Sequence, residues 1–211
     1  MLKRLANFLR TAKSVKYVDS MGLKSRDDLS MVVPLIKSVG REPEARVESE
    51  ETIRLSFEES PVTRTFAADM ILMYALDRAD WLEYVSNGAI EQLGVSKEEL
   101  HARAIEDLPN RLPPIEVHDC GGGVVGLSAG GSFEASLLLV DRLWQDLAKH
   151  LPGEPLAAVP ARDLLFAIGS AQPRATELIA ERAQIDLPDK RYEISKVVLI
   201  RSDGKWQAHS T

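Results

Sequence analysis

The chain has 211 residues, of which 45% are apolar, so it is long enough for one domain with a sizeable core and is not disordered as a whole. Its single cysteine excludes an intramolecular disulfide and an all-cysteine metal site, which is typical of a reducing compartment, and we expect a cytoplasmic location. The 26 basic and 32 acidic residues give a net charge of −6, which argues against nucleic-acid binding by overall charge.

The charge is divided unevenly along the chain. Residues 1–26 hold seven basic residues and one acidic residue, a balance of +6, and the remaining chain carries −12. Apolar residues at helical spacing between Leu2 and Ala12 predict a basic amphipathic helix. We therefore predict a leader at 1–26 and a single α+β domain at 27–211. Docking of the helix on the acidic body is favoured over binding to an anionic membrane, because one short helix binds membranes weakly.

Strand patterns come first in the domain. Apolar runs predict strands at residues 29–37, 66–76 and 81–85, and alternating polar and apolar side chains predict half-buried strands at 45–50 and 52–57. Pro34 confines the first strand to a sheet edge or a bend, because proline has no N–H for the ladder. The run from Phe66 to Leu76 is apolar on both faces, which favours a central strand over a buried helix.

Helical and hairpin patterns alternate in the rest of the chain. Ser96 and Glu99 form a capping box for a helix that Pro109 is expected to end. Before and after this helix, the patterns predict a short helix at 89–93, a hairpin of strands 115–120 and 123–127, and a strand at 135–140 that leads into a helix capped by Asp141 and ending at Leu151. The last part of the chain is predicted to form strands at 156–159 and 164–168 and a helix from Pro173 to Ala183. A C-terminal hairpin of strands 194–201 and 205–209 is predicted around Asp203-Gly204.

Strands joined by hairpins outnumber strict strand–helix alternation in this order. The sequence therefore predicts an α+β fold with a mixed or mainly antiparallel sheet, helices packed on one face and a C-terminal β-hairpin.

One short motif suggests catalysis. Residues 126–130 match the G-x-S-x-G pattern of the nucleophile elbow, in which a strained strand-to-helix turn exposes a serine. Ser128 would be the nucleophile, with Asp163 as the orienting acid and His209 as the base. Glycine-rich patterns of five residues arise easily by chance, and no clean helix follows Gly130, so a glycine-rich hairpin or bulge is favoured. We name no catalytic residue and keep a serine hydrolase as an alternative.

Other chemistry-bearing residues form no convincing set. His118 and Cys120 lie two residues apart on a predicted strand and would share a face, but no third residue orients the pair. The four histidines are scattered without a ligand spacing, and Leu127-Ser128 stands where a phosphate loop needs lysine followed by serine or threonine. We therefore predict no metal and no cofactor.

Several blocks between about residues 31 and 170 resemble, in the expected order, the YtpQ-like family of uncharacterised bacterial proteins. The blocks are Thr65–Met70, Tyr74–Asp77, Tyr84–Val85, Leu93–His101, Gly131–Leu139 and Val159–Asp163. The resemblance implies a bacterial cytosolic α+β domain without a known activity, cofactor or substrate. Ser128 lies outside the matched blocks, which weighs against the serine elbow.

Five polar residues inside the matched blocks are the candidate ligand-binding residues: Asp69, Asp77, Glu134, Arg162 and Asp163. Burying a carboxylate without a partner is costly, so each should be paired, capped or placed at a cleft. The favoured interpretation is a structural network in which Arg162 pairs with Asp69 or Glu134. The alternative is a small polar pocket in which Glu134 and Asp163 receive a ligand and Arg162 binds its anionic group.

Since no coherent catalytic set emerges, the sequence favours a non-enzymatic binding or protein-interaction domain. We expect a protein partner or self-association and no nucleic acid. The alternatives are a serine hydrolase using Ser128 and a peripheral membrane protein bound through its basic N-terminal helix.

Overall fold

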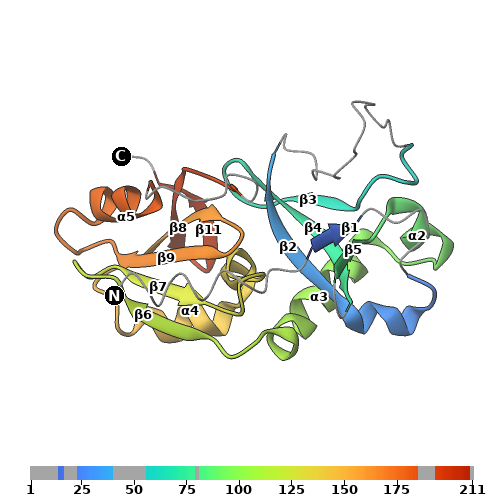
Figure 1. The fold of residues 1–211 in the computed structure, drawn as a ribbon, viewed down its shortest axis with the longest axis horizontal. Coiled ribbons are helices and arrows are strands. Elements are labelled where there is room, and N and C mark those ends of the chain that lie inside the picture. The colour runs from blue at the N-terminus through green and yellow to red at the C-terminus, as the bar shows by residue number, and fades with distance from the viewer. Residues whose placement is uncertain (1–13, 17–22, 40–55, 79–80, 185–192, 210–211) are drawn as a thin grey trace.

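The strands form two sheets that lie next to each other along the long axis of the molecule (Figure 1). The computed structural model describes residues 14–16, 23–39, 56–78, 81–184 and 193–209. It confirms the α+β class and the mainly antiparallel pairing. The division of the strands over two sheets was not predicted from the sequence.

The first sheet has the strand order β1-β5-β4-β2, with β3 also paired to β4. Its strands are β1 (Ser14–Lys16), β2 (Val32–Ser38), β3 (Thr63–Thr65), β4 (Met70–Asp77) and β5 (Trp81–Tyr84). Strand β4 is central, as its continuous apolar run predicts, and β2, which contains Pro34, is at the edge. All pairs are antiparallel except β1 with β5.

Helices of the first half pack against one face of this sheet. They are η2 (Arg26–Met31), α2 (Asn87–Gln92) and α3 (Lys97–Arg111), and α3 buries Leu100, Ala104 and Leu108 in the main core. The Ser96 side chain accepts the Glu99 N–H at 3.0 Å, so the serine half of the predicted capping box is confirmed, and the Glu99 carboxylate accepts a hydrogen bond from Arg26. The prediction that Pro109 ends the helix is wrong: α3 continues to Arg111, since a proline in the last turn removes only one helical hydrogen bond.

The second sheet is a fully antiparallel ribbon of six strands in the order β11-β10-β8-β9-β7-β6. The strands are β6 (Glu116–Asp119), β7 (Val125–Ser128), β8 (Pro155–Ala161), β9 (Leu164–Gly169), β10 (Val198–Ser202) and β11 (Lys205–Ala208). The C-terminal hairpin of β10 and β11 is confirmed. Asp203 and Gly204 both have positive φ at its turn, the backbone geometry that Asp-Gly favours in two-residue hairpins.

Both faces of the second sheet are covered by helical segments. Helix α5 (Ala175–Ala183) packs on one face, and η3 (Ala135–Leu139) with α4 (Asp141–Ala148) lies against the other. The strand predicted at 135–140 is wrong, because a continuous apolar run reads the same in a buried 3₁₀ helix as in a buried strand. Asp141 is the first helical residue and Val140 the N-cap, which corrects the predicted capping role of Asp141.

One continuous apolar cluster joins the two sheets. It includes Leu72 and Leu76 of the first sheet and Val159 and Leu199 of the second, together with the fully buried Trp144 of α4. The Trp144 ring meets the Trp206 ring of β11 edge-on, with centroids 4.6 Å apart. Helix α4 is thereby fixed against the C-terminal hairpin.

Several predictions fall on residues outside the described ranges. These are the strand at 45–50, most of the strand at 52–57 and the amphipathic helix between Leu2 and Ala12. Of the predicted leader, Ser14–Lys16 forms β1 on β5, and Arg26 donates hydrogen bonds to Glu99 and to the Gly94 carbonyl. In the part of the chain that the structure describes, no helix is both long and apolar enough to cross a membrane.

Candidate functional site

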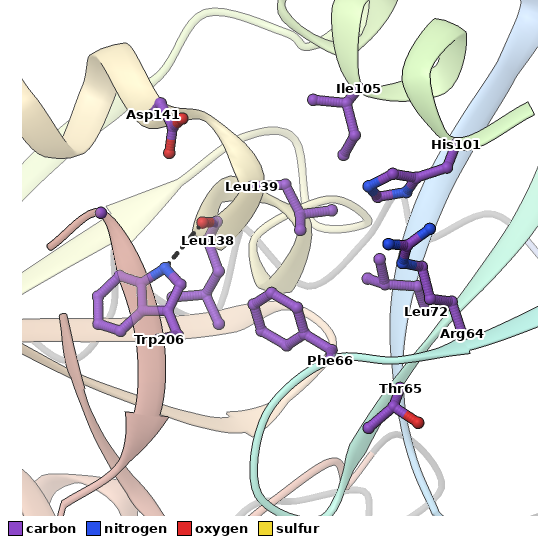
Figure 2. A pocket seen from close by; sticks show the side chains of 11 residues that line it. Arg64, Thr65, Phe66, Leu72, His101, Ile105, Leu138, Leu139, Asp141 and Trp206 are labelled. Carbon is purple, nitrogen blue, oxygen red and sulfur yellow. Dashed lines mark hydrogen bonds between the residues drawn. The ribbon is translucent and has the colours of Figure 1, made fainter. Parts of the chain in front are cut away.

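A shallow groove of about 210 Å³ opens between the two sheets (Figure 2). The first sheet and α3 contribute Arg64, Thr65, Phe66, Leu72, His101 and Ile105; η3, α4 and the C-terminal hairpin contribute Leu138, Leu139, Asp141, Gly204 and Trp206. Six of these eleven lining residues have apolar or aromatic side chains, and Arg64, Thr65, His101 and Asp141 add polar groups. The volume is below the roughly 300–1,000 Å³ of pockets for drug-sized ligands, so the groove suits a small ligand.

The secondary structure explains why the groove residues of the first half converge. Arg64 of β3 stands directly opposite Leu72 of β4 in the antiparallel register, so their side chains share a face. His101 and Ile105 are four residues apart on α3 and therefore lie on one side of the helix. Figure 2 shows the Arg64 guanidinium next to the His101 ring.

A positive charge and an imidazole form one end of the groove. The Tyr74 hydroxyl lies 2.9 Å from Nδ1 of His101. Burial, followed by the charge of Arg64, lowers the pKa of His101 below its usual value, and burial raises the pKa of Tyr74 to about 12. His101 is therefore held neutral over a wider pH range than a solvated histidine.

The opposite end of the groove has a balanced charge. Asp141 accepts a hydrogen bond of 2.7 Å from Nη2 of Arg201, whose side chain is only 10% exposed. Trp206 donates its Nε1–H to the Leu138 carbonyl at 2.9 Å, which fixes the indole at the groove wall (Figure 2). Arg64, by contrast, makes no ion pair with any described residue.

The predicted candidate Glu134 is fully buried and does not line the groove. Its Oε1 accepts the backbone N–H groups of Ala129 and Gly131 at 2.8 and 2.7 Å, and its Oε2 accepts that of Phe133 at 3.1 Å. Both carboxylate oxygens are thus engaged by the backbone. Glu134 fixes the loop between β7 and η3.

Arg162 lies near Glu134 at the junction between the sheets. Its backbone carbonyl accepts the Ala135 N–H at 3.2 Å, and its side chain is buried, as the embedding in apolar sequence predicted. Lys37 of β2 is also close: burial, followed by the charge of Arg162, lowers the pKa of Lys37 to about 8. Lys37 was not among the predicted site residues, because a lysine near the end of a strand usually faces solvent.

The three remaining candidates are dispersed. Asp69 is exposed in the turn between β3 and β4 and accepts a hydrogen bond from the Ser195 hydroxyl. Asp77 is at the other end of β4, and Asp163 is in the turn between β8 and β9. None of the five predicted residues lines the groove, and their role in ligand binding stays a prediction.

Ser128 is the last residue of β7 and is not on a strand-to-helix elbow. Its Oγ is 2.9 Å from Nε2 of His118, and the same nitrogen is 3.5 Å from Oε2 of Glu116. A catalytic triad needs the acid on the other ring nitrogen. The Ala129 N–H, which would stabilise the oxyanion, instead donates to Glu134.

The predicted base, His209, is engaged elsewhere. Its Nε2 is 3.1 Å from the Thr176 hydroxyl on α5, so the partnership with Ser128 is wrong. Cys120 donates weakly to the His118 carbonyl, at 3.7 Å, rather than to the imidazole. Among the described residues, no group of three or more His, Cys, Asp or Glu side chains is placed to hold a metal ion.

The groove residues Arg64 and His101 were missed by sequence reasoning. His101 is in a matched block, but a single histidine on a helix carries little signal without knowledge of what faces it. Arg64 lies in β3, a strand of three exposed residues that was not predicted from the sequence. Arg64 and His101 come together because β3 and α3 both border the groove, and no local sequence pattern encodes that arrangement.

The chain is similar to UPF0354 proteins of Listeria. It is 22% identical over 146 residues to a UPF0354 protein of Listeria monocytogenes serotype 4a, and 22% identical over 145 residues to the UPF0354 protein lin1649 of Listeria innocua. Each match covers 68% of this chain and 54% of the relative, so the chain spans about half the length of these curated proteins. The matches support a relationship to uncharacterised bacterial proteins.

No family model matches the chain. No solved structure is similar to it at a significant level.

Proposed function

We propose that this chain is a non-enzymatic binding domain whose groove between the two sheets receives the apolar part of a small ligand. The observation that carries the proposal is the composition of the groove: two separate sheets and α3 together line one hollow, in which apolar side chains lie among a few polar groups. Apolar lining with a few polar groups is typical of small-ligand sites. Within this proposal the chain is a cytoplasmic relative of the YtpQ-like family.

The engagement of the candidate catalytic groups supports a binding role. Glu134 holds three backbone N–H groups, and the Ala129 N–H is among them. His118 offers the same nitrogen to Ser128 and Glu116. A hydrolase at Ser128 would require both of these arrangements to change.

Titration with 1-hexanol, monitored by tryptophan emission, tests the proposal, because Trp206 lines the groove. We expect a saturable change that Ile105→Phe, which fills the groove, reduces strongly. Val117→Phe is the matched control, since Val117 is 54% exposed on β6, away from the groove. A response that is linear in 1-hexanol, or unchanged by Ile105→Phe, would rule out the groove as a binding site.

A second candidate function is protein interaction through β6. This strand is at the edge of the second sheet, and all four of its residues are exposed. Unpaired edge strands accept an extended segment from another protein. Glu116 and Asp119 at its two ends disfavour antiparallel self-pairing, in which they would face each other, and favour a basic partner. Val117→Pro should abolish complex formation with an extended basic peptide; unaltered binding would exclude this surface.

A further inference from the structure

We infer that the ligand of the groove is a small monocarboxylate with a short apolar chain, whose carboxylate binds between Arg64 and His101. This inference rests on the proposed binding function and adds the chemical class of the ligand. It concerns residues that were not among the candidates predicted from the sequence.

The charge distribution of the groove supports an anionic ligand end. Arg64 lies at the groove without an ion-pair partner among the described residues, and the Arg64 guanidinium stands beside the His101 ring (Figure 2). A guanidinium presents paired N–H donors that match a carboxylate. At the other end the charge of Asp141 is already balanced by Arg201, so that end offers no equivalent attraction for a cation.

The apolar chain of the ligand would lie over the middle of the groove. Leu72, Ile105 and Leu139 line this part, between Arg64 and Asp141 (Figure 2). A volume of about 210 Å³ accommodates a chain of a few carbon atoms.

A free acid fits the groove better than the carboxyl end of a peptide. A peptide needs backbone hydrogen-bond partners as well as a charge contact. The Leu138 carbonyl, which borders the groove, already accepts the Trp206 indole N–H. The ligand therefore depends on its carboxylate and its apolar chain alone.

Comparison of hexanoate with 1-hexanol by calorimetric titration of the full chain tests the inference. The two probes share their carbon chain and differ in the charged group. We expect hexanoate to bind about ten-fold more tightly, as one charge-assisted contact of about 1.4 kcal/mol predicts. Arg64→Gln should remove this preference, and Arg64→Lys should retain part of it. Arg103→Gln is the matched control, because Arg103 is exposed on α3 and pairs with Glu99.

The outcomes separate this inference from the proposed function. Equal affinity for the two probes, or a preference that survives Arg64→Gln, overturns the carboxylate inference and leaves the groove as an apolar site. Binding of neither probe overturns both proposals. Tighter binding of the tripeptide Gly-Gly-Leu than of hexanoate overturns the assignment to a free acid.

Discussion

The Tyr74 hydroxyl and Nδ1 of His101 lie 2.9 Å apart, which links the central strand β4 to the α3 side of the groove. His101 also faces Arg64 of β3. Asp141 of α4 lies across the groove, and Glu98 lies three residues before His101 on α3. Because burial and Arg64 lower the pKa of His101, the free groove contains a neutral imidazole near neutral pH. A bound carboxylate would favour the protonated form.

Carboxylate binding should therefore take up a proton at His101. We expect hexanoate affinity to rise as the pH falls from about 8 through the lowered pKa of His101, and 1-hexanol affinity to stay constant. His101→Gln should remove the pH dependence, because glutamine keeps a polar group but does not titrate. Calorimetric titrations over this pH range provide the measurement, and hexanoate affinity that is independent of pH contradicts the prediction.

The stability of the free protein should have the opposite pH dependence at His101. A folded-state pKa below the unfolded value means that the unfolded chain binds the proton more readily. The contribution of His101 to the free energy of unfolding is present above pH 6.5 and is lost as the pH falls through the lowered pKa of the folded-state imidazole. Urea titrations of the wild type and of His101→Gln should diverge on acidification, with the wild type losing more stability; parallel curves would show that His101 has no such effect.

Lys37 should destabilise the fold at neutral pH. Its pKa is lowered from 10.5 to about 8, so protonation at pH 7 favours the unfolded chain, and stability should rise between pH 8 and pH 10.5. Lys37→Met removes this partly buried charge and should stabilise the protein at pH 7 by about 1–3 kcal/mol. Thermal unfolding at pH 7 and at about pH 10 measures the effect, with the exposed Lys196→Met as control. A lower melting temperature for Lys37→Met at pH 7 contradicts the account.

Glu134 should stabilise the folded protein through its hydrogen bonds to the backbone. Glu134→Ala leaves the N–H groups of Ala129, Gly131 and Phe133 without their buried acceptor, which should cost about 3 kcal/mol or more. Glu134→Gln should cost less, since its amide oxygen still accepts two of the three groups. Denaturant unfolding gives the values, with the exposed Glu116→Gln as reference. Losses below 0.5 kcal/mol for Glu134→Ala would exclude this structural role.

Ser128 should not react as a catalytic nucleophile. A fluorophosphonate probe should not label the wild-type protein, because the Ala129 N–H is held by Glu134 and Nε2 of His118 is shared by two partners. Mass spectrometry after incubation measures labelling. Modification of Ser128 that disappears in Ser128→Ala would establish the hydrolase alternative instead.

Local patterns predicted the elements better than the site. Short apolar runs identify β2 and β4, and turn residues identify the hairpin at Asp203-Gly204, because these signals depend on neighbours in sequence. The segment at 135–139 was predicted as a strand, because burial on all sides removes the periodicity that separates helix from strand.

The candidate site shows the limit of such reasoning. Glu134 and Arg162 were singled out as buried polar residues, and both are buried. The groove itself forms where β3, α3, η3 and the C-terminal hairpin meet, far apart along the chain. Which polar residue faces a hollow therefore depends on the packing of two sheets, and the sequence pattern contains no signal for that packing.

The most direct test of the groove is a set of intermolecular nuclear Overhauser effects between hexanoate and the methyl groups of the protein. Binding of hexanoate in the groove predicts contacts from the alkyl chain to Leu72, Ile105 and Leu139, with the carboxyl end of the chain nearest Arg64. Contacts confined to methyl groups outside the groove, or no contacts at saturating hexanoate, would contradict it.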